Sequence, residues 1–214
     1  MSTITFVTAY AKHERRQLAD LLQVSGPDAP TLCAGWTTRD LAAHIVVRDR
    51  RPDAIAAQLI PPLRAHGEHV RLAKAAQPFT AVLHELRTPP VWSPLSNPLL
   101  DELTNTIEFF IHHEDCRRAT PGWQPRTLEP GEERALWRAA QLTGKLALRR
   151  AGISARVTAD GFGSFTAGTD PQVTITGAPG ELALFLSGRQ RAARVAVTGR
   201  ADVAERLREA QLGL

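Results

Sequence analysis

The chain of 214 residues is long enough for one large domain or two small ones, and its 43% hydrophobic and 22% charged residues are typical of a globular protein. No stretch approaches the roughly 20 apolar residues that a membrane-spanning helix needs. No secretory leader is recognisable, so we expect a cytoplasmic protein without a membrane partner. The formal net charge of +4 comes from arginines scattered among 22 acidic residues, which does not indicate a nucleic-acid partner because that requires clustered basic residues.

The first 150 residues show helical periodicity interrupted by proline-rich loops, and we expect them to form one helical domain. The segment 88–98 contains several prolines and is expected to be a loop. The expected helices run from the N-terminus to 25, from 38 to about 60, and over 64–87, 98–120 and 129–150.

The second of these helices has a complete start pattern. Thr37 can act as the N-cap, and Asp40, three residues later, forms an aspartate variant of the capping box. Trp36 and Leu41 occupy the positions of a hydrophobic staple. These residues set the register of the helix that carries His44.

The pattern changes after residue 150. Short β-strands are expected over 153–159, 172–176 and 194–198, with helices over 179–186 and 201–211. Residues 151–214 are therefore expected to form a small mixed α/β domain.

The helix 98–120 carries two residues that suit metal binding. Glu108 and His112 are four residues apart, so they lie one turn above the other on one flank of an apolar stripe. His113 points about 100° away and cannot face the same site. The spacing is also typical of an ordinary ion pair on a helix surface, and that alternative stays open.

His44 adds a third donor. It lies between Leu41 and Ile45 on the inward side of its helix, where a lone histidine can also be a core residue. Two imidazoles and one carboxylate would leave one coordination position open, as in catalytic zinc sites, although iron(II) can be held in the same way. Asp115 or Cys116 could supply a fourth ligand, and the two cysteines, Cys33 and Cys116, are expected to be reduced thiols.

The stretch TLCAGWTTRDLAAHIVVRDRRPDA resembles the first ligand helix of the mycothiol-dependent maleylpyruvate isomerase family, within the DinB-like metalloproteins, and NTIEFFIHHEDCRRATPGW resembles its second. The match is especially close to an actinobacterial subgroup described only as metal-binding proteins. TITGAPGELALFLSGRQRAARVAVTGR resembles the small C-terminal domain of that family.

The resemblance implies a mainly α fold, a DinB-like four-helix bundle followed by a small α/β domain. It implies Zn2+ or another divalent metal held by His44, Glu108 and His112, with mycothiol as the thiol cofactor. A metal-activated thiolate would then act on a small electrophilic substrate, in an isomerase or an S-transferase. Arg189, in Ser187-Gly188-Arg189, matches an arginine that assists catalysis and is the candidate anchor for a substrate carboxylate.

Two other functions remain open at this point. The chain could bind metal without catalysis, as a sensor, a store or an interaction module. It could also be a structural bundle with a core Glu–His pair. The substrate is not implied by the resemblance, because specificity would depend on the loop 88–98 and on the C-terminal domain.

Overall fold

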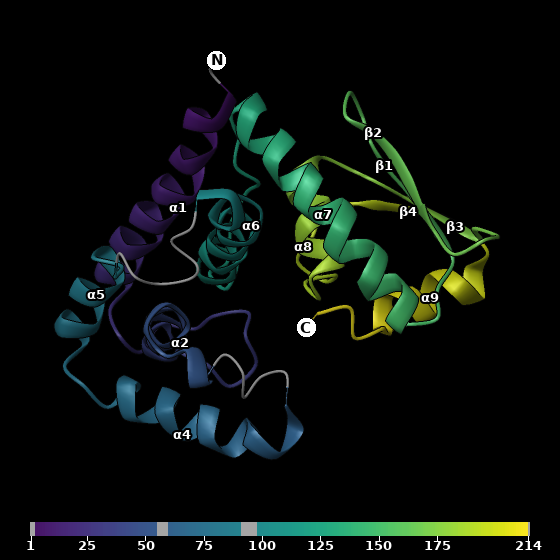
Figure 1. Ribbon diagram of the computed structural model, residues 1–214. Coiled ribbons are helices and arrows are strands. Elements are labelled where there is room, and N and C mark those ends of the chain that lie inside the picture. Colours follow the sequence, from purple (N-terminus) through teal and green to yellow (C-terminus); the bar gives the residue numbers. More distant parts are fainter. Residues whose placement is uncertain (1–2, 55–59, 91–97, 214) are drawn as a thin grey trace. The chain divides into compact units, whose positions relative to one another are not determined.

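A computed structural model describes residues 3–54, 60–90 and 98–213 (Figure 1). The chain divides into two compact units, 1–123 and 124–214. The fold class expected from the sequence is confirmed, since helices are followed by one small sheet. None of the helices in the described ranges is long and apolar enough to cross a membrane.

Helices form the N-terminal unit. Residue Thr37 begins α2 with the expected capping box, in which its backbone N–H donates to Asp40 Oδ2 at 3.0 Å. The helices are α1 (Thr3–Ser25), α2 (Thr38–Arg50), the short 3-10 helix η1 (Pro61–Leu63), α4 (Arg64–Ala75), α5 (Phe79–Arg87) and α6 (Pro98–Arg117).

The core of this unit lies where α1 packs along α6 and where α2 packs against α4 and α5. Its fully buried side chains include Leu18, Leu41, Ile45, Leu86 and Phe109. Burial of aliphatic side chains of this size contributes about 1.5–3 kcal/mol each. This packing fixes α2 and α6 as rigid supports for the residues that they carry.

A buried ion pair also positions α2. Arg15 of α1 donates to Asp49 Oδ2 at 2.6 Å and to the carbonyl oxygen of Leu86 at 2.9 Å. Its guanidinium lies 4.4 Å from the ring centroid of Phe109. Because a buried charge without its partner is costly, these contacts connect α1, α2, α5 and α6 in one arrangement.

Two helices replace the one expected over 64–87. α4 ends at Ala75, and α5 begins after Pro78. Proline lacks a backbone N–H and clashes with the preceding turn, so the helix cannot continue through it. Most of the loop expected over 88–98 lies outside the described residues.

The C-terminal unit contains a four-stranded sheet of order β2-β1-β3-β4. β1 is antiparallel to β2 and parallel to β3, and β4 is antiparallel to β3. The unit comprises α7 (Pro130–Arg150), β1 (Ala155–Ala159), β2 (Gly163–Ala167), β3 (Val173–Thr176), α8 (Pro179–Leu186), β4 (Ala196–Gly199) and α9 (Ala201–Glu209). β2 was not expected from the sequence, where no strand was placed between residues 159 and 172; it follows the glycine-rich turn 160–163.

Helix α7 packs against α8 and β2 and so belongs to the C-terminal unit. From the sequence we expected the boundary between the two domains after this helix, at residue 150. The close approach depends on Gly144, where a Cβ would lie 2.6 Å from Leu186 Cδ1. Helical periodicity alone does not show which layer a helix packs on, and this is why the expected boundary differs from the observed division.

Candidate metal centre

Three side chains from α2 and α6 converge in the N-terminal unit. Glu108 Oε1 lies 3.4 Å from His44 Nε2 and 3.3 Å from His112 Nε2. One donor atom of each residue lies within 4.8 Å of the others. We call His44, Glu108 and His112 the donor cluster. The residues singled out from the sequence are therefore brought together, although their binding of metal stays a prediction.

Local structure explains the convergence. The capped start of α2 fixes the direction in which His44 projects, and Glu108 and His112 are one turn apart on α6. His44 also contacts the ring of Trp36, with 5.2 Å between centroids. The guanidinium of Arg71 of α4 lies over the same Trp36 ring, 4.7 Å from its centroid. The donors thus come from two helices, and a third helix supports them.

The charges of the cluster are strongly coupled. Burial raises the pKa of the Glu108 carboxyl, but hydrogen bonds with His112 and His44 and the charge of Arg48 outweigh it and hold this pKa well below its ordinary value. Burial lowers the pKa of His44. Burial also opposes protonation of His112, but its hydrogen bonds with Asp115, Cys33 and Glu108 raise its pKa well above the ordinary value. A cation bound to His112 must displace that proton.

Asp115 contacts the opposite edge of the His112 ring. Its Oδ2 lies 3.0 Å from His112 Nδ1, while His112 Nε2 faces Glu108. A carboxylate on one ring nitrogen orients the other nitrogen toward a metal, an arrangement frequent in metalloproteins. Asp115 is fully buried and suits this orienting role better than the role of a fourth ligand on the Glu108 side.

Cys33 lies next to the donor cluster, which was not expected from the sequence. Its thiol donates to Asp115 Oδ2 at 3.2 Å, and Cys33, His112 and Asp115 form a second group of close potential ligands. The backbone N–H of Leu32 donates to the carbonyl oxygen of Asp115 at 3.0 Å, which holds this loop against α6. The only hint in the sequence was the position of Cys33 just before the capped helix.

Cys116 is part of the apolar core of the N-terminal unit, where burial raises the pKa of its thiol. Among the described residues it belongs to neither group of close potential ligands. His113 is buried and its Nδ1 lies 3.0 Å from Glu14 Oε2, which agrees with the expectation that it faces away from His112. Almost every residue of α6 from Asn105 to Cys116 is buried. The helix is therefore buried on several sides, whereas the sequence predicted a single apolar stripe.

Arg48 is a further neighbour of the donor cluster. Its Nε lies 3.4 Å from Glu108 Oε1, and its Nη1 donates to Asn105 Oδ1 at 2.6 Å.

Arg189, the predicted substrate anchor, lies in the C-terminal unit just after α8 and donates to the carbonyl oxygen of Ser187 at 2.7 Å. Its role at the site stays a prediction.

Comparisons with known proteins show what the N-terminal segment is similar to. Residues 11–95 match the family described as "Mycothiol maleylpyruvate isomerase N-terminal domain". This segment is therefore similar to the N-terminal domain of that family. The resemblance inferred from the sequence is thereby confirmed, with His44 inside the matched segment and Glu108 and His112 beyond it.

The fold extends the comparison over nearly the whole chain. The crystal structure of the mycothiol-dependent maleylpyruvate isomerase matches with a TM-score of 0.61 and 15% identity, covering 93% of this chain and 95% of that one. A point mutant of that isomerase matches with the same TM-score and coverage and 14% identity. No curated protein sequence matches the chain significantly. At this identity the comparison shows a shared isomerase fold.

Proposed function

We propose that the protein binds one divalent metal ion, zinc in the cell, through His44, Glu108 and His112. The observation that carries this proposal is the convergence of two imidazoles on one carboxylate from two separate helices. An ordinary surface ion pair between Glu108 and His112 would not require His44 on the same oxygen. The side chain of His112 is only 9% exposed, which also argues against a surface pair.

The distances fit a zinc ion. Zinc–ligand bonds of about 2.0–2.1 Å at tetrahedral angles place two ligand atoms roughly 3.3–3.4 Å apart. Glu108 Oε1 lies 3.4 Å and 3.3 Å from the two imidazole Nε2 atoms. Two histidines and one carboxylate are a ligand set of catalytic zinc sites, which keep a position for a further ligand.

We further propose that the protein is a cytoplasmic, mycothiol-dependent isomerase or S-transferase that acts on a small electrophile. The solved structures that share its fold are those of a mycothiol-dependent isomerase. A bound metal ion would lower the pKa of the thiol cofactor and so maintain it as the nucleophilic thiolate.

The residues around the cluster have separate tasks in this proposal. Asp115 orients His112, and Arg48, which donates a hydrogen bond to Asn105, contacts the carboxylate of Glu108. Arg189 would anchor a substrate carboxylate, since a guanidinium binds this group through two parallel hydrogen bonds.

A metal-binding protein without catalysis is the second candidate. The group of Cys33, Asp115 and His112 favours it, because a thiolate is the commonest ligand of structural zinc sites. A metal held on that side of His112 would need Cys33, whereas a metal held by the donor cluster would need His44 and Glu108.

Elemental analysis of tag-free protein tests the proposal, with His44→Ala, Glu108→Ala, Cys33→Ser and, as a matched control, His66→Ala. We expect about one zinc per chain in the wild type, in Cys33→Ser and in His66→Ala, and loss of zinc in the other two variants. Saturable mycothiol binding to the zinc form, measured by calorimetry, would then support the enzyme. Full zinc occupancy in folded Glu108→Ala would refute the ligand assignment, and zinc without mycothiol binding would favour the second candidate.

A further inference from the structure

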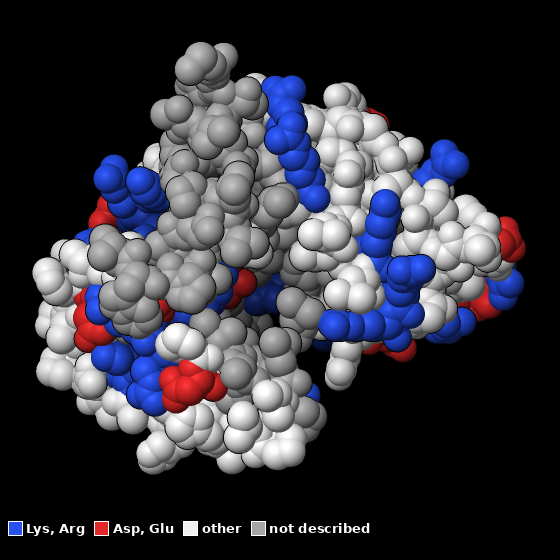
Figure 2. All heavy atoms as spheres, in the orientation of Figure 1, with Lys and Arg blue, Asp and Glu red and all other residues white. Residues whose placement is uncertain are grey.

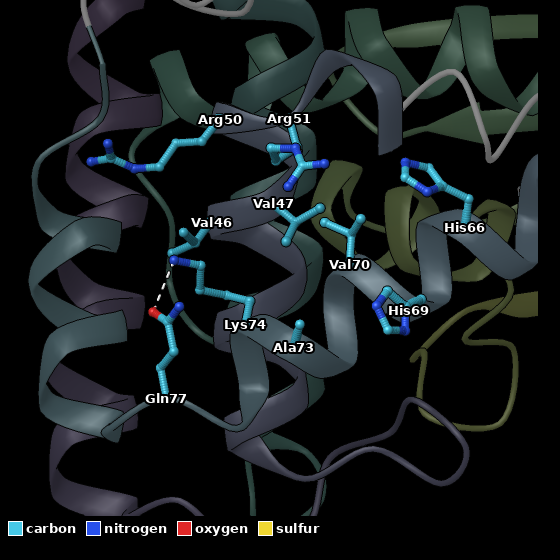
Figure 3. Close-up of a pocket in the computed structure, with 10 residues that line it drawn as sticks. All are labelled: Val46, Val47, Arg50, Arg51, His66, His69, Val70, Ala73, Lys74 and Gln77. Carbon is cyan, nitrogen blue, oxygen red and sulfur yellow. Dashed lines mark hydrogen bonds between the residues drawn. The ribbon is translucent and has the colours of Figure 1, made fainter.

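A second concave site lies between α2 and α4, apart from the donor cluster (Figure 3). Its volume is about 440 Å3, within the range of small-molecule pockets. Val46, Val47 and Val70 form its apolar wall, and each is nearly completely buried. None of the three donor-cluster residues lines it, so the site is separate from the proposed metal centre.

The polar lining of this pocket is basic. Arg50, Arg51 and Lys74 contribute three cations, and His66 and His69 contribute two imidazoles. The described residues that line the pocket include no carboxylate. We call this site the basic pocket.

Carboxylates just outside the lining satisfy part of this charge. Glu85 lies 3.0 Å from Lys74 Nζ and 3.3 Å from Arg50 Nε. Asp53 accepts hydrogen bonds from Nε and Nη2 of Arg51 at 2.9 and 2.8 Å. Three cations therefore face two carboxylates, and an excess of positive charge remains even when both histidines are neutral. Basic and acidic side chains also lie next to one another on the visible surface of the N-terminal unit in Figure 2.

The two ends of the pocket differ in the donors that they leave available. At one end Lys74 donates to Gln77 at 3.0 Å, and Arg50 donates to the carbonyl oxygen of Thr88 at 2.7 Å. Nε of Arg50 lies 3.3 Å from Glu85 and is buried without a hydrogen-bond partner among the described residues. At the other end, Figure 3 shows Arg51, His66 and His69 gathered beside Val47 and Val70. Within the described part of the chain, neither His69 nor Nη1 of Arg51 has a hydrogen-bond partner.

We propose that the basic pocket binds a small organic anion, with its carboxylate at Arg51 and His69 and its apolar body against Val47 and Val70. A carboxylate is favoured because the guanidinium and the imidazole both donate hydrogen bonds, and bonds to an ionised acceptor are the strong ones. The apolar wall favours a hydrocarbon body over a fully hydrated inorganic ion. This site is independent of the proposed metal chemistry.

Three probes of one shape test the charge of the ligand: benzoate, neutral benzamide and cationic benzylamine. Calorimetry on the full chain, with histidine side-chain NMR resonances to locate the binding, should show saturable benzoate binding and the largest shifts at His66 and His69. Benzamide and benzylamine should bind at least about tenfold more weakly, since each lacks the charge-assisted contact.

Variants then locate the site. Arg51→Gln and His69→Ala should each weaken benzoate binding about fivefold to tenfold, while the exposed control His84→Ala should leave it unchanged. His44→Ala should also leave it unchanged, which separates this site from a carboxylate bound at the metal. Equal affinity for benzamide, unchanged affinity in both pocket variants, or loss of binding in His44→Ala would each overturn the proposal.

Discussion

The donor cluster and the basic pocket both contain two histidines and an adjacent carboxylate, yet they are chemically different. In the donor cluster Glu108 Oε1 lies 3.4 Å from His44 and 3.3 Å from His112, and Arg48 Nε lies 3.4 Å from the same oxygen. In the pocket region Asp53 contacts His66 at 2.8 Å, but both oxygens of Asp53 are occupied by Arg51.

The arginine that contacts the carboxylate therefore affects the charge of each site as much as the metal-binding side chains do. Arg48 gives its shorter hydrogen bond, 2.6 Å, to the neutral Asn105 and shares Glu108 Oε1 with the two imidazoles. Arg51 pairs with both oxygens of Asp53, and Arg50 and Lys74 share the single carboxylate of Glu85, so the pocket has an excess of positive charge. Similar residue types therefore favour a cation in one place and an anion in the other.

The largest expected effect separates the two regions directly. Glu108→Ala should weaken zinc binding by more than about 100-fold, because loss of an outer hydrogen-bond partner alone typically costs 10–100-fold. Asp53→Ala, which removes the carboxylate of the other region, should leave zinc affinity unchanged. Competition with a coloured zinc chelator measures the zinc affinity of both variants. Equal losses of affinity in the two variants would contradict the proposed difference between the donor cluster and the basic pocket.

Zinc should also stabilise the folded protein through the donor cluster alone. At a free zinc concentration 100 times the Kd, the stabilisation should be about 2.7 kcal/mol, because the ion binds the folded state. Thermal unfolding with zinc and with a chelator measures this shift in Tm. The shift in Tm should persist in His66→Ala and disappear in His44→Ala. The reverse pattern would place the metal beside His66 and not in the donor cluster.

Asp115→Asn should lower zinc affinity by about 10–100-fold while the metal still binds, since this change weakens the orientation of His112 without removing a ligand. Cys33→Ser is the matched control, because it keeps a donor to Asp115 and should change the affinity much less. A larger effect of Cys33→Ser than of Glu108→Ala would move the metal to the Nδ1 side of His112.

The smallest expected effect concerns the element shared by both regions. Thr37→Ala removes the N-cap of α2, which carries His44 and ends just before Arg51, and should lower the free energy of unfolding by about 0.5–2 kcal/mol. Thr80→Ala, at an exposed position in α5, is the control. Chemical denaturation measures both, and an unchanged stability in Thr37→Ala would show that packing alone holds the start of α2.

Local patterns in the sequence were informative where one helix decided the outcome. The capping box at Thr37 and Asp40 formed as expected, and the spacing of Glu108 and His112 placed them on one flank of α6. The break between α4 and α5 was missed although Pro78 marks it, because the amphipathic pattern runs on across it. The hairpin strand β2 was missed because it follows the glycine-rich turn so closely.

Periodicity, capping and motif were enough to predict the mainly helical class, the C-terminal α/β unit, the family resemblance and the three residues that meet in the donor cluster. Only the tertiary structure decided that Cys33 lies against Asp115, that Cys116 lies in the core, and that α7 packs against the sheet of its own unit. It alone also showed that Arg51 pairs with both oxygens of Asp53, whereas Arg48 shares Glu108 Oε1 with two imidazoles. The physical reason is that helical periodicity fixes the direction of a side chain on its own helix, whereas the partner that it meets depends on how separate elements pack.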